Sequence, residues 1–261
     1  MIDSAFTRGT QDIAAEVQKA AAEPKVDGIV LEIASPGGEV FGVAEAWASI
    51  REAARAKPVV ASVNSEAASA AYYLASAASE IVVTPSGMVG SVGVYSLHID
   101  ASKALEDMGE AWDFVVAKDS PFKVEGAPTG PLSAEAREAV QGHVDRYMAM
   151  FVRDVARGRS VPVAQVREGF GKGRMVGPED AVAARMADRV GTFDDAIRRA
   201  SAMARERREG APAGGRMEHP MNLSIEEGPA PTPAVEEPAP TPEAGATDQE
   251  RAAWLRLLAA V

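Results

Sequence analysis

The 261-residue sequence contains no cysteine. It therefore has no disulfide, no thiolate metal ligand and no cysteine nucleophile. It also lacks the run of about 18 apolar residues that a membrane-spanning helix needs. Its first ten residues, MIDSAFTRGT, do not show the basic stretch followed by an apolar stretch that marks a signal peptide. We expect a cytoplasmic protein that does not bind to a membrane.

Positive charge is also scarce. The chain has 27 Lys and Arg against 38 Asp and Glu, which gives a net charge of −11. Nucleic-acid binding needs a concentrated basic surface, so we expect no nucleic-acid partner. The hydrophobic fraction of 46% is sufficient for a core, and the length suits one large domain or two small ones.

The first third of the sequence alternates between short apolar runs and helical patterns. The runs at 28–33, 58–63 and 81–84 predict buried strands, and the segments 10–22, 40–56 and 69–79 predict helices. This alternation is typical of an α/β fold of repeated strand-helix units with a mostly parallel sheet.

The middle of the chain is less regular. A glycine-rich stretch at 87–94 precedes a predicted helix at 102–108, a fourth strand at 112–116 and an irregular loop at 118–131. A long amphipathic helix follows at 133–157, with Ser133 as its cap. Its expected buried stripe consists of Val140, Val144, Tyr147, Phe151 and Val155. Shorter helices at 162–170, 178–186 and 193–207 and a strand at 188–190 complete a domain that we expect to span 1–207.

The composition changes after this domain. Segment 208–247 is acidic and rich in Pro and Ala, and eight of the 17 prolines lie in it. Such a segment cannot bury enough apolar area to offset its ordering entropy, so we predict a disordered linker. Segment 248–261 predicts a short amphipathic helix with Trp254, Leu257 and Leu258 on one face. It either docks on a protein surface or frays.

Ser69 stands out within the stretch NSEAASAAYYLASAA because only small residues flank it. A serine nucleophile needs a base and oxyanion donors. The N–H of Ala70 and the glycine turn at Gly37 and Gly38, which follows the first buried strand, could supply the donors. Alternatively, Ser69 is an ordinary small residue that packs in a helix.

The base is not settled by the residues alone. Of the three histidines only His98 lies near the glycine-rich stretch, and no aspartate is clearly placed to orient it. A lysine is the other option, because a buried lysine can lose its proton near neutral pH. Lys118 and Lys123 both lie in the irregular loop.

Four separate motifs together resemble the S49 peptidase family. They are SPGG at 35–38, AASAAYYLASAASEIVV at 67–83, VGSVGV at 89–94 and KVEGAP at 123–128. The resemblance implies a Clp protease/crotonase-like fold and a serine–lysine dyad without metal or cofactor. Carried onto this chain, it makes Ser69 the nucleophile and Lys123 the base, with Lys118 as the second choice. Ser91 would orient the lysine amine, and Gly38 and Ala70 would bind the oxyanion.

The resemblance also suggests a biological role. The family includes signal peptide peptidase A and phage head-maturation proteases. SAAY at 69–72 and the lack of a membrane anchor favour the phage or prophage subgroup, which trims scaffold and capsid precursors. It further implies a homo-oligomeric ring. The first residues hardly provide the apolar strand that the family usually has before its first helix.

Three alternatives differ in chemistry or role. One is an inactive assembly protein on a protease fold. Another is a quality-control protease similar to signal peptide peptidase. The third, crotonase-like enolate chemistry, would leave Ser69 and the loop lysine without a purpose.

Overall fold

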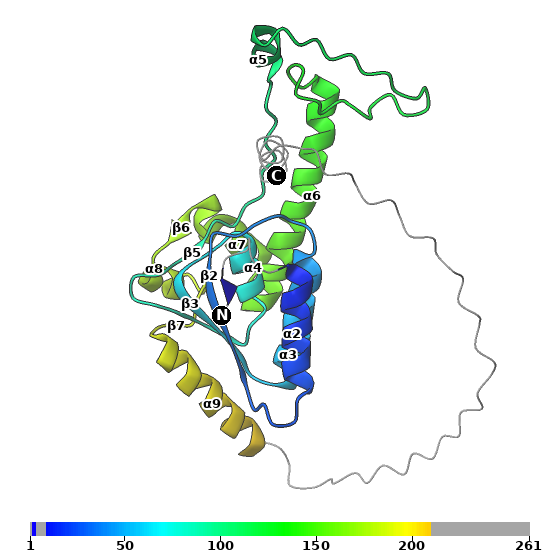
Figure 1. The fold of residues 1–261 in the computed structure, drawn as a ribbon. Helices are drawn as coiled ribbons and strands as arrows, with labels where there is room; N and C mark the ends of the chain where they lie inside the picture. The colour runs from blue at the N-terminus through cyan, green and yellow to red at the C-terminus, as the bar shows by residue number, and fades with distance from the viewer. Residues whose placement is uncertain (1, 4–8, 210–261) are drawn as a thin grey trace, which may run out of the picture. The chain divides into compact units, whose positions relative to one another are not determined.

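A largely parallel sheet forms the centre of the described part of the chain, residues 2–3 and 9–209 of this computed structural model (Figure 1). Its strands are β1 (Ile2–Asp3), β2 (Ile29–Ser35), β3 (Val59–Ala68), β4 (Glu80–Val83), β5 (Met88–Gly90), β6 (Met175–Val176) and β7 (Arg189–Val190). The strand order is β1-β2-β3-β4-β7, and all neighbours in this row are parallel. The alternation of strands and helices predicted from the sequence is therefore confirmed.

Strand β3 is the central strand, and it changes partner along its length. Its first half, where residues 59–63 are all buried, pairs with β4. Its second half pairs with β5, with Ala68 opposite Gly90. Strand β6 then pairs with β5 in the antiparallel direction. Because β3 runs past the end of β4, it reaches further than the predicted strand 58–63 and ends directly before Ser69.

Helices cover both faces of the sheet. The helices are α2 (Thr10–Ala22), α3 (Val43–Ala56), α4 (Ala70–Ala75), α5 (Ser102–Asp107), α6 (Ala134–Arg159), α7 (Val163–Gly169), α8 (Pro178–Ala183) and α9 (Phe193–Glu209), with a 3-10 turn at Gly171–Gly173. Helix α5 lies away from the sheet (Figure 1). The main core lies between one face and α2, α3, α4 and the C-terminal half of α6. Helix α9 lies along the other face (Figure 1). There Ala196 and Ala200 of α9 pack against Val60 and Val82.

Most predicted helices are present with boundaries shifted by a few residues. Ser133 caps α6 as expected, because its Oγ accepts a hydrogen bond from the N–H of Ala136 at 3.0 Å. Helix α4 is shorter than the predicted 69–79 and has six residues. No helix in the described ranges has the length and apolar character needed to cross a membrane.

Three expectations about local structure are wrong. Ile2–Asp3 does form a strand, parallel to β2, although the sequence there has little strand character. Segment 112–116 forms no strand, because it has no sheet edge to pair with and Val115 is 95% exposed. The stripe on α6 is buried only in its C-terminal half: Phe151 and Val155 are buried, whereas the residues before them are partly exposed.

Residues 95–132, which we call the arm, connect β5 and its following turn to α6. Two hydrogen bonds tie the two halves of the arm together, from the N–H of Ala101 to the carbonyl of Pro128 at 2.8 Å and between His98 Nε2 and the carbonyl of Gly130 at 2.9 Å. The arm leads into the N-terminal end of α6 (Figure 1). The predicted linker 208–247 begins at the end of α9, and nearly all of it, with the helix 248–261, lies outside the described residues.

Candidate active site

Ser69 occupies the turn between strand β3 and helix α4. Its backbone angles, φ 49° and ψ −121°, lie in a region that residues other than glycine rarely adopt. Such a conformation costs about 1–3 kcal/mol and persists only where the surrounding structure enforces it. Here the N–H of Ser69 donates to the carbonyl of Gly90 on β5 at 2.9 Å. A strained strand-to-helix turn also exposes the nucleophilic serine in the α/β-hydrolases.

The glycine turn after β2 lies directly against Ser69. Gly37 has φ 110°, and a Cβ atom on it would lie 2.8 Å from Ser69 Cβ and 3.1 Å from the backbone N of Ala70. Only glycine lets the turn approach this closely. The N–H of Gly37 donates to Ser35 Oγ at 3.2 Å and is therefore occupied. The N–H groups of Gly38 and Ala70 have no hydrogen-bond partner among the described residues, which leaves these two as candidate oxyanion donors.

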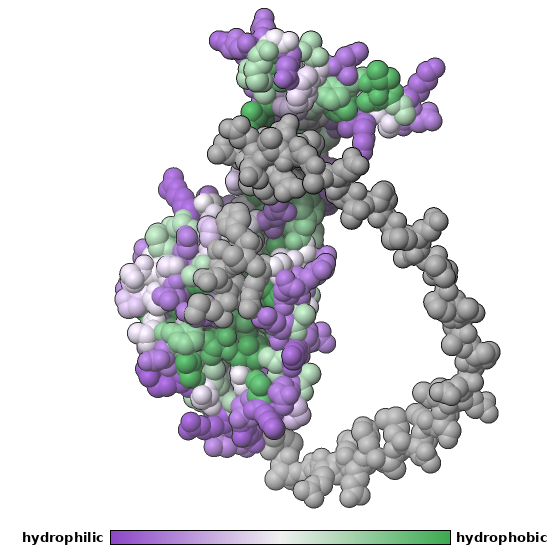
Figure 2. Space-filling view, viewed as in Figure 1, coloured by the Kyte–Doolittle hydropathy of each residue, from purple (hydrophilic) through white to green (hydrophobic). Residues whose placement is uncertain are grey.

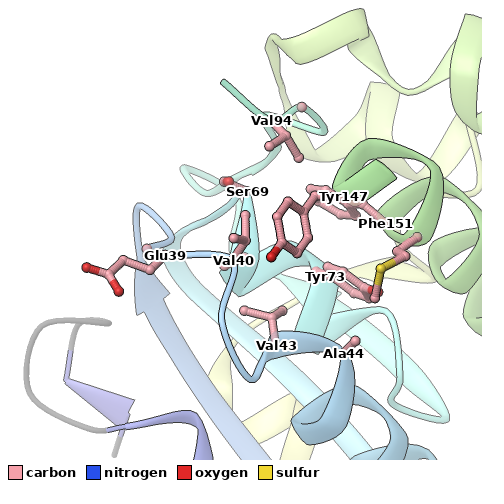
Figure 3. A pocket seen from close by; sticks show the side chains of 13 residues that line it. Glu39, Val40, Val43, Ala44, Ser69, Tyr73, Val94, Tyr147 and Phe151 are labelled. Atoms are coloured by element: carbon pink, nitrogen blue, oxygen red, sulfur yellow. The ribbon is translucent and has the colours of Figure 1, made fainter. Parts of the chain in front are cut away.

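A largely apolar pocket opens beside Ser69 (Figure 3). Its walls come from the loop after the glycine turn, from α3, α4 and α6, and from the stretch after β5. The lining residues are Gly38, Glu39, Val40, Val43, Ala44, Ser69, Ala70, Tyr73, Gly93, Val94, Tyr147, Met150 and Phe151. The carboxylate of Glu39 points away from the hollow in Figure 3, whereas the ring of Tyr147 projects into it. The pocket therefore suits an apolar side chain.

Ser91 lies next to Ser69 across the β3–β5 pair. Ala68 is the partner of Gly90, so the register places the two following serines side by side. Adjacent strands are about 4.8 Å apart, so the backbones of the two serines are neighbours. Ser91 also has a positive φ of 51°, and its N–H donates to the carbonyl of Arg174 at 2.9 Å. The register thus sets the backbone of the serine predicted as nucleophile and that of the serine predicted to orient the base at neighbouring strand ends.

None of the three predicted bases, Lys123, Lys118 and His98, lines the pocket beside Ser69. Lys118 and Lys123 are both exposed in the arm, and His98 is bound to the Gly130 carbonyl there. Among the described residues that line the pocket there is no lysine or histidine. Tyr147 is 13 residues from the start of α6, so the pocket lies about 20 Å along the helix from the end at which the arm joins.

The arm exposes many large apolar side chains. They are Tyr95, Leu97, Ile99, Met108, Trp112, Phe114, Val115 and Phe122. Figure 2 shows hydrophobic residues at the surface of this part of the chain, among hydrophilic ones. Apolar side chains gathered on one exposed segment are typical of a surface that another protein covers.

Two residues near the site were not singled out from the sequence. Tyr73 lines the pocket, and its hydroxyl donates to Asp154 Oδ2 on α6 at 2.6 Å. Burial, followed by the neighbouring carboxylate, raises the pKa of Tyr73, so the phenol stays protonated. A sequence signal did exist. Asp154 is next to Val155 and three residues after Phe151 on the apolar stripe of α6, where a carboxylate needs a specific partner.

Comparison with known proteins identifies the family. Residues 51–206 match the model of Peptidase family S49, which covers more than half of the chain. The chain belongs to this family, which confirms the resemblance drawn from the four motifs. The match begins after the SPGG turn, so that turn is not part of it.

Several relatives share about a third of their aligned residues with this chain. Capsid assembly protease C of Escherichia phage lambda is 35% identical over 191 residues, which are 72% of this chain and 42% of that protein. Protease 4 of Salmonella typhi is 33% identical over 199 residues, 76% of this chain and 31% of that protein. Head-tail preconnector protein GP5 of Enterobacteria phage P21 is 36% identical over 148 residues, 57% of this chain and 29% of that protein. The chain thus spans less than half the length of each.

Solved structures show a weaker likeness. A mutant of the 1510-N membrane-bound stomatin-specific protease in complex with a substrate peptide is 15% identical, covers 74% of each chain and has a TM-score of 0.49. An enoyl-CoA hydratase/carnithine racemase from Magnetospirillum magneticum is also 15% identical, covers 78% of this chain and 65% of its own, and has a TM-score of 0.43. The parallel sheet with helices on both faces makes the fold α/β.

Proposed function

We propose that this chain is a serine endopeptidase in which Ser69 attacks the carbonyl carbon of a peptide bond. The observation that carries the proposal is the strained turn of Ser69, which faces an apolar pocket and touches the glycine turn. The carbonyl oxygen would become an oxyanion held by the N–H groups of Gly38 and Ala70. The peptide nitrogen would leave with a proton, and water would hydrolyse the acyl-enzyme.

The pocket supports a protein substrate with a small or medium apolar side chain next to the cleaved bond. Its walls are valine, alanine and aromatic side chains, and the Tyr73 hydroxyl is already bound to Asp154. A charged side chain placed there would lose its hydration without gaining a partner.

We further propose that Lys123 is the base, with Lys118 as the second choice, and that Ser91 orients its amine. Within one copy of the chain, the arm joins α6 at its N-terminal end, and the pocket lies about 20 Å further along that helix. The base for each Ser69 would therefore come from the arm of another copy. Assembly into a homo-oligomer would at the same time cover the apolar side chains that the arm exposes.

Mixing two inactive variants tests this arrangement. Ser69→Ala lacks the nucleophile and Lys123→Ala lacks the base, so neither should cleave alone. After the two are unfolded together and refolded into mixed oligomers, some sites combine an intact Ser69 with an intact Lys123, and cleavage should return. If mixed oligomers form but stay inactive, the base does not come from another copy.

We propose that the biological substrates are scaffold or capsid precursors of a phage or prophage, processed in the host cytoplasm. Two phage relatives named for capsid assembly and for head-tail connection support this role. The relative named Protease 4 supports a second candidate, a bacterial protease of quality control. An inactive assembly protein remains a third candidate, and it would carry Ser69 without reacting through it.

Mass spectrometry after incubation with the matching head precursor tests the function. Wild type should release defined fragments, and Ser69→Ala should release none. Lys123→Ala should also be inactive, whereas Lys118→Ala should cleave. If Lys118→Ala loses cleavage and Lys123→Ala keeps it, Lys118 is the base. If Ser69→Ala still cleaves, Ser69 is not the nucleophile and the proposed function is wrong. Cleavage of unrelated unfolded proteins but not of the precursor would favour the quality-control role.

A further inference from the structure

A buried hydrogen bond joins the helix that follows Ser69 to helix α6. Tyr73 Oη donates to Asp154 Oδ2 over 2.6 Å, a short distance typical of a charge-assisted bond. Asp154 is 3% exposed and Tyr73 is 6% exposed. A carboxylate this deeply buried needs several donors, so its position is fixed by the groups that bind it.

The remaining donors to Asp154 come from the solvent side of α6. Arg153 reaches Oδ1 with Nε at 3.0 Å and Oδ2 with Nη2 at 3.2 Å, and Arg157 Nη1 lies 3.4 Å from Oδ1. Both arginine side chains are more than half exposed. Tyr73 is therefore the donor on the pocket side, and it connects the carboxylate to α4.

Tyr73 is in turn fixed to its surroundings at three further points. Its N–H donates to the carbonyl of Ser69 at 2.9 Å, and its carbonyl accepts from Ser76 Oγ at 2.6 Å. Its ring stacks on Phe151 with centroids 4.6 Å apart and planes 6° from parallel. A movement of Tyr73 thus moves the backbone of the turn that carries Ser69.

We propose that Tyr73 and Asp154 are positioning residues that hold Ser69 at the angle its attack requires. The proposal rests on the proposed function of Ser69 as nucleophile. Helix α4 has only six residues and cannot fix its own orientation, so tertiary contacts must do so. The strained turn at Ser69 likewise needs external support. The hydrogen bond to Asp154 supplies that support one helical turn after the serine.

The neighbouring tyrosine provides a matched control. Tyr72 is also buried on α4, and its hydroxyl donates to the carbonyl of Met186 at 3.0 Å, away from the pocket. Tyr72→Phe and Tyr73→Phe each remove one buried phenol oxygen and one hydrogen bond from the same helix. A merely structural role predicts similar effects for both variants. A positioning role predicts a loss of reactivity only for Tyr73→Phe.

The experiment measures the rate at which a fluorophosphonate probe labels Ser69, together with kcat and KM for a peptide substrate. Labelling of wild type at Ser69 tests the proposed function independently of the variants. Tyr73→Phe should then lower the labelling rate and kcat about tenfold or more, because a misplacement of about 1 Å can cost about 100-fold. KM should change less than twofold, because the phenyl ring and its stacking remain in the pocket. Tyr72→Phe should label at the wild-type rate.

Two further measurements keep the proposal open to refutation if Tyr73→Phe folds poorly. Asp154→Asn, which keeps an acceptor for the phenol, should retain more activity per folded molecule than Asp154→Ala. Hydrogen exchange of the amides of residues 70–75 should become faster in Tyr73→Phe than in Tyr72→Phe. If wild type is labelled at Ser69 but Tyr73→Phe reacts at the wild-type rate, or if Asp154→Ala equals Asp154→Asn in activity, Tyr73 and Asp154 do not position the nucleophile.

Discussion

Replacing Gly37 with alanine puts the close contact of the two turns to a direct test. The new Cβ would lie 2.8 Å from Ser69 Cβ and 2.9 Å from the carbonyl oxygen of Ala68. Alanine at a positive φ costs about 1–2 kcal/mol, and overpacking against backbone costs about 1–3 kcal/mol more. We therefore expect Gly37→Ala to lower the free energy of unfolding by about 2–5 kcal/mol. Part of this strain can be relieved only if the turn that carries Ser69 moves.

Such a movement would impair the site in the molecules that remain folded. A shift of about 1 Å in a reacting group costs about 100-fold in rate. The assay combines urea unfolding with the rate constant for fluorophosphonate labelling, corrected for the folded fraction. Gly142→Ala is the control, because that glycine lies on α6 and, apart from its chain neighbours and the backbone of its own helix, no atom lies within 4 Å of the added Cβ. It should stabilise the protein by about 0.5–1 kcal/mol and leave labelling unchanged.

The reasoning would be refuted if Gly37→Ala unfolded at the wild-type urea concentration and labelled at the wild-type rate. That result would mean that the glycine turn does not touch the serine turn in solution. Destabilisation without any change in the labelling rate would also count against the account. It would separate the packing of the glycine turn from the position of the nucleophile.

Three further predictions concern stability and pH. Arg159→Ala breaks a bidentate ion pair between α6 and the residue before β7, in which Arg159 is buried and Asp188 is partly exposed, so urea unfolding should show a loss of about 1.5–3 kcal/mol. Arg189→Ala removes an exposed pair and should cost at most about 1 kcal/mol. Peptide cleavage should rise toward alkaline pH, because Lys123 must be neutral to accept the proton of the serine; a flat profile would argue against a lysine base. Hydrogen bonds from Thr192 lower the pKa of Asp195 from 3.8 to about 2. The ionised Asp195 carboxylate stabilises the folded state fully above its unfolded pKa, and this contribution is lost as pH falls toward 2. The urea midpoint of Asp195→Asn should therefore fall less than that of wild type over the same pH range.

Local periodicity was sufficient to predict most of the central fold. The runs at 28–33, 58–63 and 81–84 became β2, β3 and β4, because each is flanked by a helix that returns the chain to the sheet. Segment 112–116 also consists mostly of residues that favour strands, but among the described residues no neighbouring strand is present to hydrogen-bond with its backbone. Strand β1 shows the reverse case: its two residues lie in a sequence with little strand character, but they pair with the available edge of β2.

The candidate site was predictable only in part, for a related reason. Ser69, the glycine turn and Ser91 each lie in short motifs at strand ends, and the ends of parallel strands meet. The Tyr73–Asp154 bond joins residues 81 positions apart through the packing of α4 on α6, which no local pattern encodes. The stripe on α6 illustrates the same limit. The spacing of its apolar residues could be recognised in the sequence. Which half of the stripe is buried could not, because that depends on where the sheet ends.

The most direct test of the central claim is to label the protein with a fluorophosphonate probe and map the adduct by peptide mass spectrometry. The account predicts one modified serine, Ser69, and no labelling of Ser69→Ala or of urea-unfolded wild type. Ser91 should remain unmodified, because its proposed role is to orient the base. An adduct on another serine, or a folded wild type that does not react at all, would contradict the claim that Ser69 is a nucleophile.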